Sequence, residues 1–191
     1  MKILKKEEFL EDLEFYFEEF IKGRIFIYPT DTIYGIGCDA TIEEAVQKIR
    51  NIKKRDEKPF SVIVPNKEWI IKNCFINENS EKWIDKLPGA YTLIIELRNW
   101  EAVTNKINFG SDNLGIRIPA NWFSEVVKKY GKPFATTSVN IAGEPYIKQL
   151  SDLNENIKEN VDYFIDCGYL TGTPSTIVKL INGREEIVRR V

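Results

Sequence analysis

The stretch from Ile25 to Gly37 reads Ile-Phe-Ile-Tyr-Pro-Thr-Asp-Thr-Ile-Tyr-Gly-Ile-Gly. Its first four residues are an apolar run, which predicts a short buried strand over 25–28. The nine residues that follow combine a proline, two threonines, an aspartate and two glycines. In α/β proteins, ligands bind in the crevice beyond the ends of strands. Residues 29–37 are therefore a candidate ligand loop, although a rigid Pro/Gly turn would have a similar composition.

Segments with strand and helix patterns alternate on both sides of this stretch. Apolar residues at three- and four-residue spacing predict a helix over 8–22 that ends at Gly23, and the capping-box pattern Thr41–Glu44 predicts a helix to about Ile52. Further strands are predicted at 60–64, 91–97, 114–118, 134–137 and 163–166. Further helices are predicted around Trp69 and Trp83, over 122–130 and after Ser151. The chain closes with a hairpin that pairs 175–180 with 186–191 through Asn182-Gly183, a type I′ turn signal.

This alternation predicts an α/β fold, with a twisted mixed sheet and flanking helices. The closing hairpin argues against an all-parallel sheet. No linker, repeat or low-complexity tract interrupts the pattern. We expect residues 1–191 to form a single domain.

The composition excludes several classes of protein. The 191 residues carry 27 Lys+Arg and 29 Asp+Glu, a net charge of −2, which argues against a surface built throughout for nucleic acid. The sequence has no histidine, so Ser-His-Asp and Cys-His nucleophiles and His-ligated zinc are excluded. Its three cysteines are widely spaced, which indicates a reducing compartment. With no signal peptide and no membrane-length apolar run, we expect a soluble, cytoplasmic protein.

Basic residues cluster at the end of the second predicted helix. They are Lys48, Arg50, Lys53, Lys54, Arg55 and Lys58. Such a cluster is usually a solvated helix face. In the irregular backbone after the helix, however, Lys53 and Arg55 can converge on a polyphosphate, where each charge pair is worth ~4 kcal/mol before desolvation.

Polar residues also stand at the ends of other predicted strands. Thr136 to Asn140 offers hydroxyls and an amide, as an ordinary Asx or Ser turn also would. Arg117 lies inside an apolar strand, where it needs an anionic partner or an exposed edge. Ser175 opens the final hairpin. Gly35 to Ala40 matches G-x-G-x-x-A, but its distance from the preceding strand is wrong for a dinucleotide-binding loop.

Six motifs occur together and in order. They are Pro29–Gly37, Lys53-x-Arg55, Pro88-Gly89-x-x-Thr92, Gly115-x-Arg117-x-Pro119, Ser138-x-Asn140 and Ser175–Val178. On these motifs the chain resembles the YrdC/TsaC family from about Gly23 to Arg189. That family comprises threonylcarbamoyl-AMP synthases, which join L-threonine, bicarbonate and ATP, release pyrophosphate and supply the t6A modification of tRNA. The resemblance implies a twisted α/β sheet around a large basic cleft, in the short, single-domain form.

The resemblance also implies roles for individual residues. Thr30, Arg117, Thr136 and Ser175 would bind threonine, with Arg117 paired to its carboxylate and Thr136 contributing mainly backbone. Lys53, Arg55, Ser138 and Asn140 would form the catalytic constellation around the nucleotide, with Lys58 and Arg189 as further nucleotide-binding residues. Mg²⁺ would accompany ATP, held by its phosphates and water rather than by a set of protein ligands. Expected partners are the proteins of the later transfer step, and tRNA or double-stranded RNA.

The chain departs from the family pattern at three places. Arg55 to Pro59 lacks the usual proline and is one residue short, Tyr146-Ile-Lys148 replaces Ser-Pro-Thr, and Arg189-Arg-Val191 replaces Arg-Pro-Gly. These departures keep two alternatives open. One is a non-catalytic module that binds double-stranded RNA or tRNA through the basic cluster. The other is a family paralogue with a different acyl acceptor, such as a carbamoyl-adenylate enzyme related to hydrogenase maturation.

Overall fold

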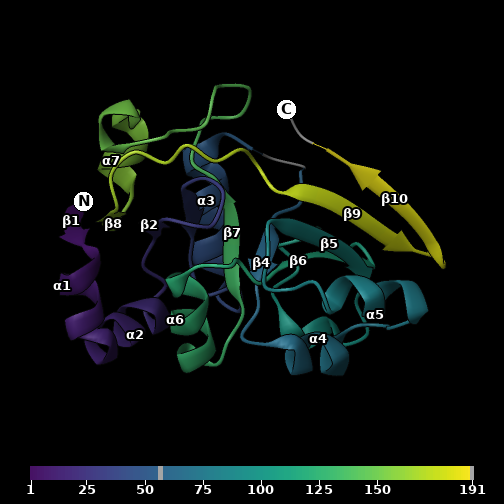
Figure 1. The fold of residues 1–191 in the computed structure, drawn as a ribbon. Helices are drawn as coiled ribbons and strands as arrows, with labels where there is room; N and C mark the ends of the chain where they lie inside the picture. The colour runs from purple at the N-terminus through teal and green to yellow at the C-terminus, as the bar shows by residue number, and fades with distance from the viewer. Residues whose placement is uncertain (56–57, 190–191) are drawn as a thin grey trace.

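The computed structural model describes residues 1–55 and 58–189, which form one mixed sheet covered by helices (Figure 1). The strands follow the order β1-β8-β2-β3-β7-β4-β6-β5-β9-β10. Their bounds are β1 Lys2–Lys5, β2 Phe26–Tyr28, β3 Gly35–Gly37, β4 Ser61–Ile63, β5 Tyr91–Glu96, β6 Asn113–Arg117, β7 Phe134–Ser138, β8 Tyr163–Asp166, β9 Thr176–Ile181 and β10 Arg184–Val188. The helices are α1 Lys6–Glu11, α2 Leu13–Ile21, α3 Glu43–Lys53, α4 Lys67–Asn73, α5 Glu78–Ile84, α6 Trp122–Tyr130 and α7 Glu155–Asn160, with 3-10 turns at Trp100–Ala102 and Leu150–Asp152.

Two hydrophobic cores lie on opposite faces of the sheet, because strand side chains alternate between faces. In the strand that opens the family motifs, Ile25 and Ile27 belong to one core while Phe26 and Tyr28 belong to the other. The first core runs under the whole sheet and includes residues of α3, α4, α5 and α7. The second lies over β1, β8, β2 and β7 and reaches only Ile63 of β4 in the other half, and α1, α2 and α6 cover the sheet there.

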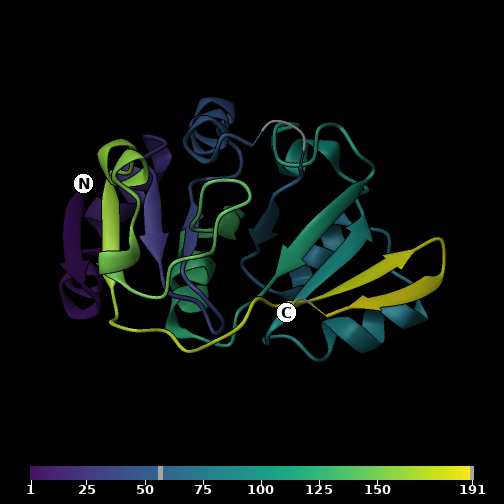
Figure 2. The same ribbon diagram turned by 90° about the horizontal axis from the view of Figure 1, so that it is seen from above.

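This unequal cover leaves one face of the other half-sheet without helices. On β6, Leu114 and Ile116 are in the first core, so the alternate residues of this strand face away from it. On β5, Leu93 and Ile95 are also in the first core, so the alternate residues of this strand face away from it as well. Figures 1 and 2 show that the β9–β10 hairpin extends this half of the sheet, while the segment 167–175 crosses from β8 to reach it. The uncovered face is where a ligand can enter.

The N-terminal region differs from its prediction. The helix expected over 8–22 is two helices, preceded by the unpredicted edge strand β1. The break falls at Asp12, which has non-helical dihedral angles and whose Oδ1 accepts the backbone N–H of Phe15 at 3.4 Å. An aspartate that caps a new helix competes with continuation of the old one. The predicted end at Gly23 is confirmed, with φ of +72°.

The capping box predicted at Thr41 is wrong. The helix begins at Glu43, and Ile42 occupies the cap position without a side-chain hydrogen bond. The Thr41 hydroxyl instead donates to Oδ1 of the buried Asp39 at 2.6 Å. The helix expected after Ser151 is likewise a 3-10 turn followed by α7, which Asn154 caps.

Most of the other elements lie within one or two residues of their predicted positions, but β3 and the 3-10 turn Trp100–Ala102 were not predicted, and β10 begins at Arg184 rather than at Glu186. The sheet is mixed, and the final hairpin turns through Asn182 and Gly183, both at positive φ as a type I′ turn requires. Parts of the predicted 55–59 loop and of the hairpin's end fall at 56–57 and 190–191, outside the described residues. Within the described ranges, no helix is both long and apolar enough to cross a membrane.

Candidate active site

A cavity of about 510 Å³ lies on the uncovered face of the half-sheet. Its walls come from segments that are far apart in the sequence: Thr30, Ile33, Tyr34 and Gly35; Arg55, Pro59, Phe60 and Ser61; Thr92 and Ile94; Ser111, Asn113, Gly115 and Arg117; Thr136, Thr137 and Ser138; Pro174, Ser175, Ile177, Lys179 and Ile181. Three of these residues are cationic, and none of the described lining residues is acidic. The cavity is therefore suited to an anionic ligand.

Alternate residues of β6 form the floor of this cavity. Asn113, Gly115 and Arg117 line it, as the two-residue period of a strand requires. Gly115 pairs with Ser61 on β4, and a Cβ at Gly115 would lie 2.6 Å from Ser61 Oγ. A side chain at this position would collide with Ser61, so glycine keeps the middle of the cavity floor free of side-chain atoms.

Hydroxyl groups gather at one end of the cavity. Thr30 Oγ1 donates to the carbonyl of Ile33 at 2.7 Å and accepts its N–H at 3.2 Å, which fixes the turn after β2. Across the cavity, Ser175 Oγ lies 2.6 Å from Thr92 Oγ1. All of these side chains are held by hydrogen bonds, so this end is preorganised.

The segment 167–175 packs directly on the Thr30 turn. A Cβ at Gly172 would lie 1.9 Å from the carbonyl oxygen of Thr32, so the two backbones touch. Tyr34 anchors the start of the segment, because its hydroxyl donates to the carbonyl of Gly168 at 2.8 Å and accepts the N–H of Cys167 at 2.9 Å. This tight contact brings the segment that leads to Ser175 against the turn that carries Thr30, and both residues line the cavity.

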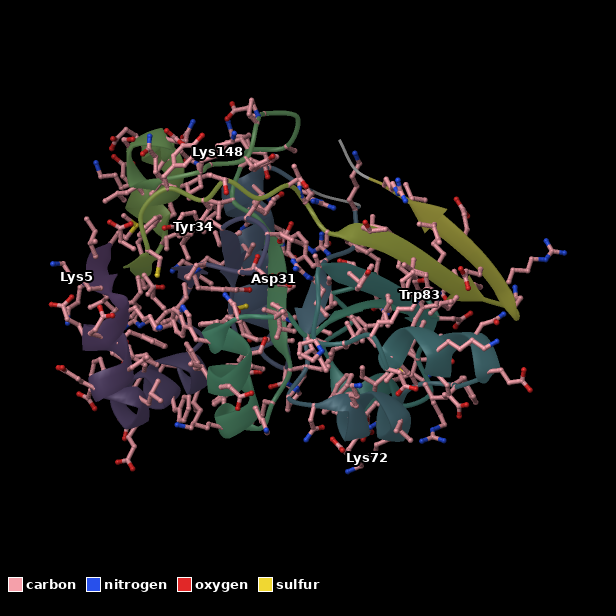
Figure 3. All side chains as sticks on the ribbon, viewed as in Figure 1. Lys5, Asp31, Tyr34, Lys72, Trp83 and Lys148 are labelled. Carbon is pink, nitrogen blue, oxygen red and sulfur yellow. The ribbon has the colours of Figure 1, made fainter. Side chains whose placement is uncertain are left out.

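Arg117 has the anionic partner that its place in an apolar strand requires. Its Nη2 lies 2.8 Å from Asp31 Oδ1 and 3.2 Å from Thr32 Oγ1. Burial lowers the pKa of the guanidinium, and the Asp31 charge opposes that shift. Asp31 Oδ2 accepts the backbone N–H of Ala120 at 2.9 Å, and in Figure 3 Asp31 lies at the centre of the molecule. Arg117 Nε is buried and has no hydrogen-bond partner among the described residues.

Lys53 lies behind the opposite end of the cavity. Its ammonium donates to the carbonyl of Ser138, to the carbonyl of Asn140 at 2.8 Å and to Asn140 Oδ1 at 2.9 Å. Ser138 Oγ also donates to Asn140 Oδ1, at 2.7 Å. Burial, and the nearby charge of Arg55, lower the pKa of Lys53 to about 7. Its contacts make Lys53 the anchor of the Ser138–Asn140 turn.

Arg55 supplies the cation on the cavity wall at this end. Its Nη1 lies 3.4 Å from Thr137 Oγ1 and its Nη2 donates to the carbonyl of Pro59 at 3.1 Å. Arg55 Nε is buried and lacks a hydrogen-bond partner within the described ranges. Burial lowers the pKa of this guanidinium as well.

Arg50 fixes the loop that carries Arg55. Its guanidinium lies between two rings, 4.2 Å from the centroid of Phe60 and 3.9 Å from that of Phe109. It donates to the carbonyls of Arg55 and Lys58, at 3.4 and 3.1 Å, on either side of the loop. It also donates to the carbonyl of Lys106, through Nε at 2.8 Å. Sequence reasoning gave Arg50 no role beyond membership of the basic cluster.

The structure thus brings together six of the predicted site residues: Thr30, Arg55, Arg117, Thr136, Ser138 and Ser175 line one cavity. Lys53 and Asn140 lie just behind its wall, joined to Ser138 by hydrogen bonds. Lys58 and Arg189 are exposed and are not among its lining residues.

The basic cluster is not the continuous exposed surface that an RNA-binding module would need. Arg50 and Lys53 are buried, and Lys48 Nζ lies 3.3 Å from Asp162. Only Lys54 and Lys58 of this cluster are fully exposed.

Several lining residues were missed. Tyr34, Ser61, Asn113, Lys179 and Ile181 received no role from the sequence, although Asn113 lies two positions before Gly115 and four before Arg117. The strand was predicted to begin at Leu114, one residue too late to include Asn113; continuing its alternation by one position would have identified this residue.

The described residues do not form a metal centre. None of the lining residues is a carboxylate, and no cluster of three or more Cys, Asp or Glu is suited to a metal within the ranges described. Mg²⁺ in proteins is held by carboxylates together with substrate phosphates and water. A dedicated Mg²⁺ cage does not fit this set of hydroxyl and amide oxygens.

The fold is that of an α/β protein with a cavity suited to a small anionic ligand, and a family model described as "Telomere recombination", that of Sua5, YciO and YrdC, matches residues 18–191. The chain belongs to the Sua5/YciO/YrdC family.

Two curated relatives illustrate the similarity. A protein of Methanocaldococcus jannaschii, provisionally named threonylcarbamoyl-AMP synthase, is 36% identical over 181 residues, which are 93% of this chain and 84% of that protein. The threonylcarbamoyl-AMP synthase of Pseudoalteromonas translucida is 25% identical over 171 residues, 85% of this chain and 90% of that protein.

Solved structures share the fold. A P. abyssi Sua5 variant has a TM-score of 0.88 and 26% identity; the match covers 99% of this chain but 56% of that one, so this chain spans little more than half of Sua5. A second P. abyssi Sua5 structure, a complex with L-threonine, has a TM-score of 0.86 and 24% identity, covering 98% and 56%. E. coli YciO has a TM-score of 0.83 at 22% identity, with 98% and 92% covered.

Proposed function

We propose that this chain is a threonylcarbamoyl-AMP synthase, an enzyme that converts L-threonine, bicarbonate and ATP to threonylcarbamoyl-adenylate and pyrophosphate. One observation carries the proposal: a single cavity joins a hydroxyl-lined end, with Thr30, Arg117 and Ser175, to a cationic end, with Arg55 beside Ser138. An amino acid and a nucleotide need these two environments next to each other. The names of the curated relatives support the same activity.

Threonine binds at the hydroxyl end in this proposal. The guanidinium of Arg117, which lines the cavity, donates to the substrate carboxylate while Asp31 and Thr32 hold its Nη2. Thr30 and Ser175, which both line the cavity, hydrogen-bond the substrate's polar groups, and Thr136 contributes backbone. The crystal structure of P. abyssi Sua5 with L-threonine supports an amino acid site in this fold.

The nucleotide phosphates bind at the cationic end. Arg55 contacts them directly, together with the hydroxyl of Ser138. Lys53 and Asn140 act as positioning residues, because Lys53 holds the Ser138–Asn140 turn through three oxygen atoms. Lys58 and Arg189 lie outside this arrangement and have no part in the proposal.

The chemistry needs no histidine. The amine of threonine adds to carbon dioxide derived from bicarbonate and loses a proton, which gives a carbamate anion. A carbamate oxygen then forms a bond to the α-phosphorus of ATP, and the bond from that phosphorus to the bridging oxygen of pyrophosphate breaks. The nucleophile is already an anion, so the protein aligns the reactants and stabilises the charge on the leaving pyrophosphate.

Mg²⁺ enters as part of the Mg·ATP substrate in this proposal, since the cavity offers it no carboxylate. The product is a reactive mixed anhydride. Further proteins would transfer its threonylcarbamoyl group to tRNA as the t6A modification, in the cytoplasm.

The test is exchange of labelled pyrophosphate into ATP by the purified chain. We expect exchange only when threonine and bicarbonate are both present, and mass spectrometry should detect threonylcarbamoyl-adenylate. Exchange that needs carbamoyl phosphate and ignores threonine would establish the paralogue instead. Absence of exchange together with strongly salt-dependent binding of RNA would establish the non-catalytic alternative.

A further inference from the structure

A tight turn over residues 108–111 leads into β6. The backbone N–H of Ser111 donates to the carbonyl of Asn108 at 3.1 Å, and Asn108 Nδ2 donates back to the carbonyl of Ser111 at 2.6 Å. The two residues between them, Phe109 and Gly110, have φ of +56° and +67°. Two successive positive φ angles closed by such a hydrogen bond define a type I′ turn.

Phenylalanine is an unfavourable residue at the first central position of this turn. Asparagine, aspartate and glycine are preferred there, since a bulky side chain is strained at positive φ. The same chain follows this preference in the β9–β10 hairpin, where Asn182 and Gly183 have φ of +54° and +71°. A strained residue persists only where its surroundings hold it. The contacts of the Phe109 ring must therefore explain why it stands here.

The ring of Phe109 lies on the guanidinium of Arg50. The guanidinium carbon is 3.9 Å from the centroid of this ring and 4.2 Å from that of Phe60, on its other side. The face of an aromatic ring attracts a cation, and the attraction is stronger where water is excluded. Arg50 is 2% exposed whereas Phe109 is 45% exposed, so Phe109 is the outer layer of this stack.

Arg50 carries this contact to the loop with Arg55. Its Nη1 donates to the carbonyls of Arg55 and Lys58, at 3.4 and 3.1 Å, while Nε donates to the carbonyl of Lys106 at 2.8 Å. A guanidinium is planar and its donors point in fixed directions. The orientation of the plane therefore sets where these carbonyls lie, and the ring of Phe109 fixes that orientation.

We infer that Phe109 is a positioning residue for the nucleotide phosphates: its ring holds the guanidinium plane of Arg50, and Arg50 holds the loop that presents Arg55. This inference rests on the proposed function, because it takes Arg55 as the contact to the phosphates of ATP. Phe109 is not among the described lining residues of the cavity, so it acts through Arg50 rather than on the ligand.

Substitutions at this position separate stability from nucleotide binding. Phe109→Asn gives the turn the residue that it favours, whereas Phe109→Leu keeps an apolar side chain at the strained angle, and neither has a ring. We expect both variants to bind ATP about fivefold more weakly, although Phe109→Asn should be the more stable of the two in urea. Phe109→Tyr keeps the ring and should bind ATP as the wild type does.

A second pair of measurements shows whether the effect passes through Arg50. In an Arg50→Met background, Phe109→Asn should cause no further loss of ATP affinity, because the cation that the ring holds is gone. The KM for threonine should stay unchanged in every Phe109 variant. Phe75→Leu is the matched control, because Phe75 is exposed to a similar extent, 51% against 45%, and lies beyond the end of α4.

Titration calorimetry measures ATP affinity independently of turnover. If Phe109→Asn binds ATP more tightly than Phe109→Leu, so that affinity follows stability, the ring is only part of the packing and the inference is overturned. Wild-type affinity in both variants overturns it as well, whatever the activity. If the wild-type chain forms no threonylcarbamoyl-adenylate but loss of the ring weakens ATP binding only while Arg50 is present, the proposed function fails and this inference stands. Failure of the wild-type chain to bind ATP overturns both.

Discussion

The carboxylate of Asp31 lies 2.8 Å from the guanidinium of Arg117, and both side chains are buried. The pair joins the turn after β2 to the end of β6, and so connects the two halves of the sheet at the threonine end of the cavity. Removing one partner of a buried ion pair leaves the other charge without compensation, which costs more than the pair itself contributes.

Asp31→Asn should therefore lower the free energy of unfolding by about 3 kcal/mol, measured by urea denaturation, and should raise the KM for threonine. The double variant Asp31→Asn, Arg117→Met removes both charges and should recover part of that stability while abolishing threonine binding. If the two substitutions prove additive in stability, the pair is not coupled and the prediction fails.

Lys53 should make stability depend on pH. Folding lowers the pKa of this side chain from its ordinary value of 10.5 to about 7, through burial and the charge of Arg55. Unfolding therefore takes up a proton between these pH values, and raising the pH from 7 to 10.5 stabilises the fold, by at most about 1.4 kcal/mol per pH unit. Urea denaturation at several pH values should show this slope in the wild type, and Lys53→Met should lack it.

Affinity for ATP should fall over the pH range in which the stability of the fold rises. The protonated ammonium has three N–H groups for the three oxygens it contacts, and the neutral amine has only two. Affinity for ATP should weaken as the pH rises above about 7. If wild type and Lys53→Met differ by amounts that do not change with pH, both in unfolding free energy and in ATP affinity, the lowered pKa of Lys53 is contradicted.

Arg50 should act on the nucleotide end through the loop it holds. Arg50→Met keeps much of the packing between Phe60 and Phe109 but removes every hydrogen bond to the loop carbonyls. We expect a loss of about 2 kcal/mol in unfolding free energy and a raised KM for ATP, with the KM for threonine little changed. Lys54→Met, at an exposed position of the same cluster, is the control and should alter neither.

Gly115 should not tolerate a side chain, because its Cβ would collide with Ser61 Oγ, and a second substitution at Ser61 should relieve this collision. Gly115→Ala places a Cβ 2.6 Å from Ser61 Oγ and should cost about 1–3 kcal/mol. Combining it with Ser61→Ala removes the clashing oxygen and should restore most of the stability, as thermal unfolding can show. Ser61→Ala alone should be nearly neutral. Failure of the double variant to recover would mean that the clash lies elsewhere.

The sequence predicted the parts of this fold that depend on local pattern. The strand 25–28 and the Asn182-Gly183 hairpin follow from hydrophobic runs and turn residues, which act over a few positions. The prediction failed at Asp12 and Thr41, where a polar side chain has two competing hydrogen-bonding choices and the tertiary structure decides. The strand Gly35–Gly37 was also missed, because glycines have low strand propensity and pair there only through the close approach of β2 and β7.

The candidate site shows a similar division. The family motifs pointed to the residues that line the cavity, such as Thr30 and Arg117. They could not distinguish Arg55, on the wall, from Lys53, behind it, because both belong to one short motif and only the path of the backbone separates them. They also missed Asn113, which lines the cavity on the same strand as Arg117 but lies outside every motif.

The contact between Gly172 and Thr32 has a consequence for folding. The pocket exists only after a segment near residue 172 has docked on one near residue 32, and such long-range contacts form late in folding because closing a large loop costs entropy. During synthesis, a chain that has emerged only as far as β8 contains Thr30, Arg55 and Arg117 but not Ser175, the neighbour of Thr92. Substrate binding then reports completion of the fold, and no shorter intermediate on the ribosome can hold the ligand in the same way.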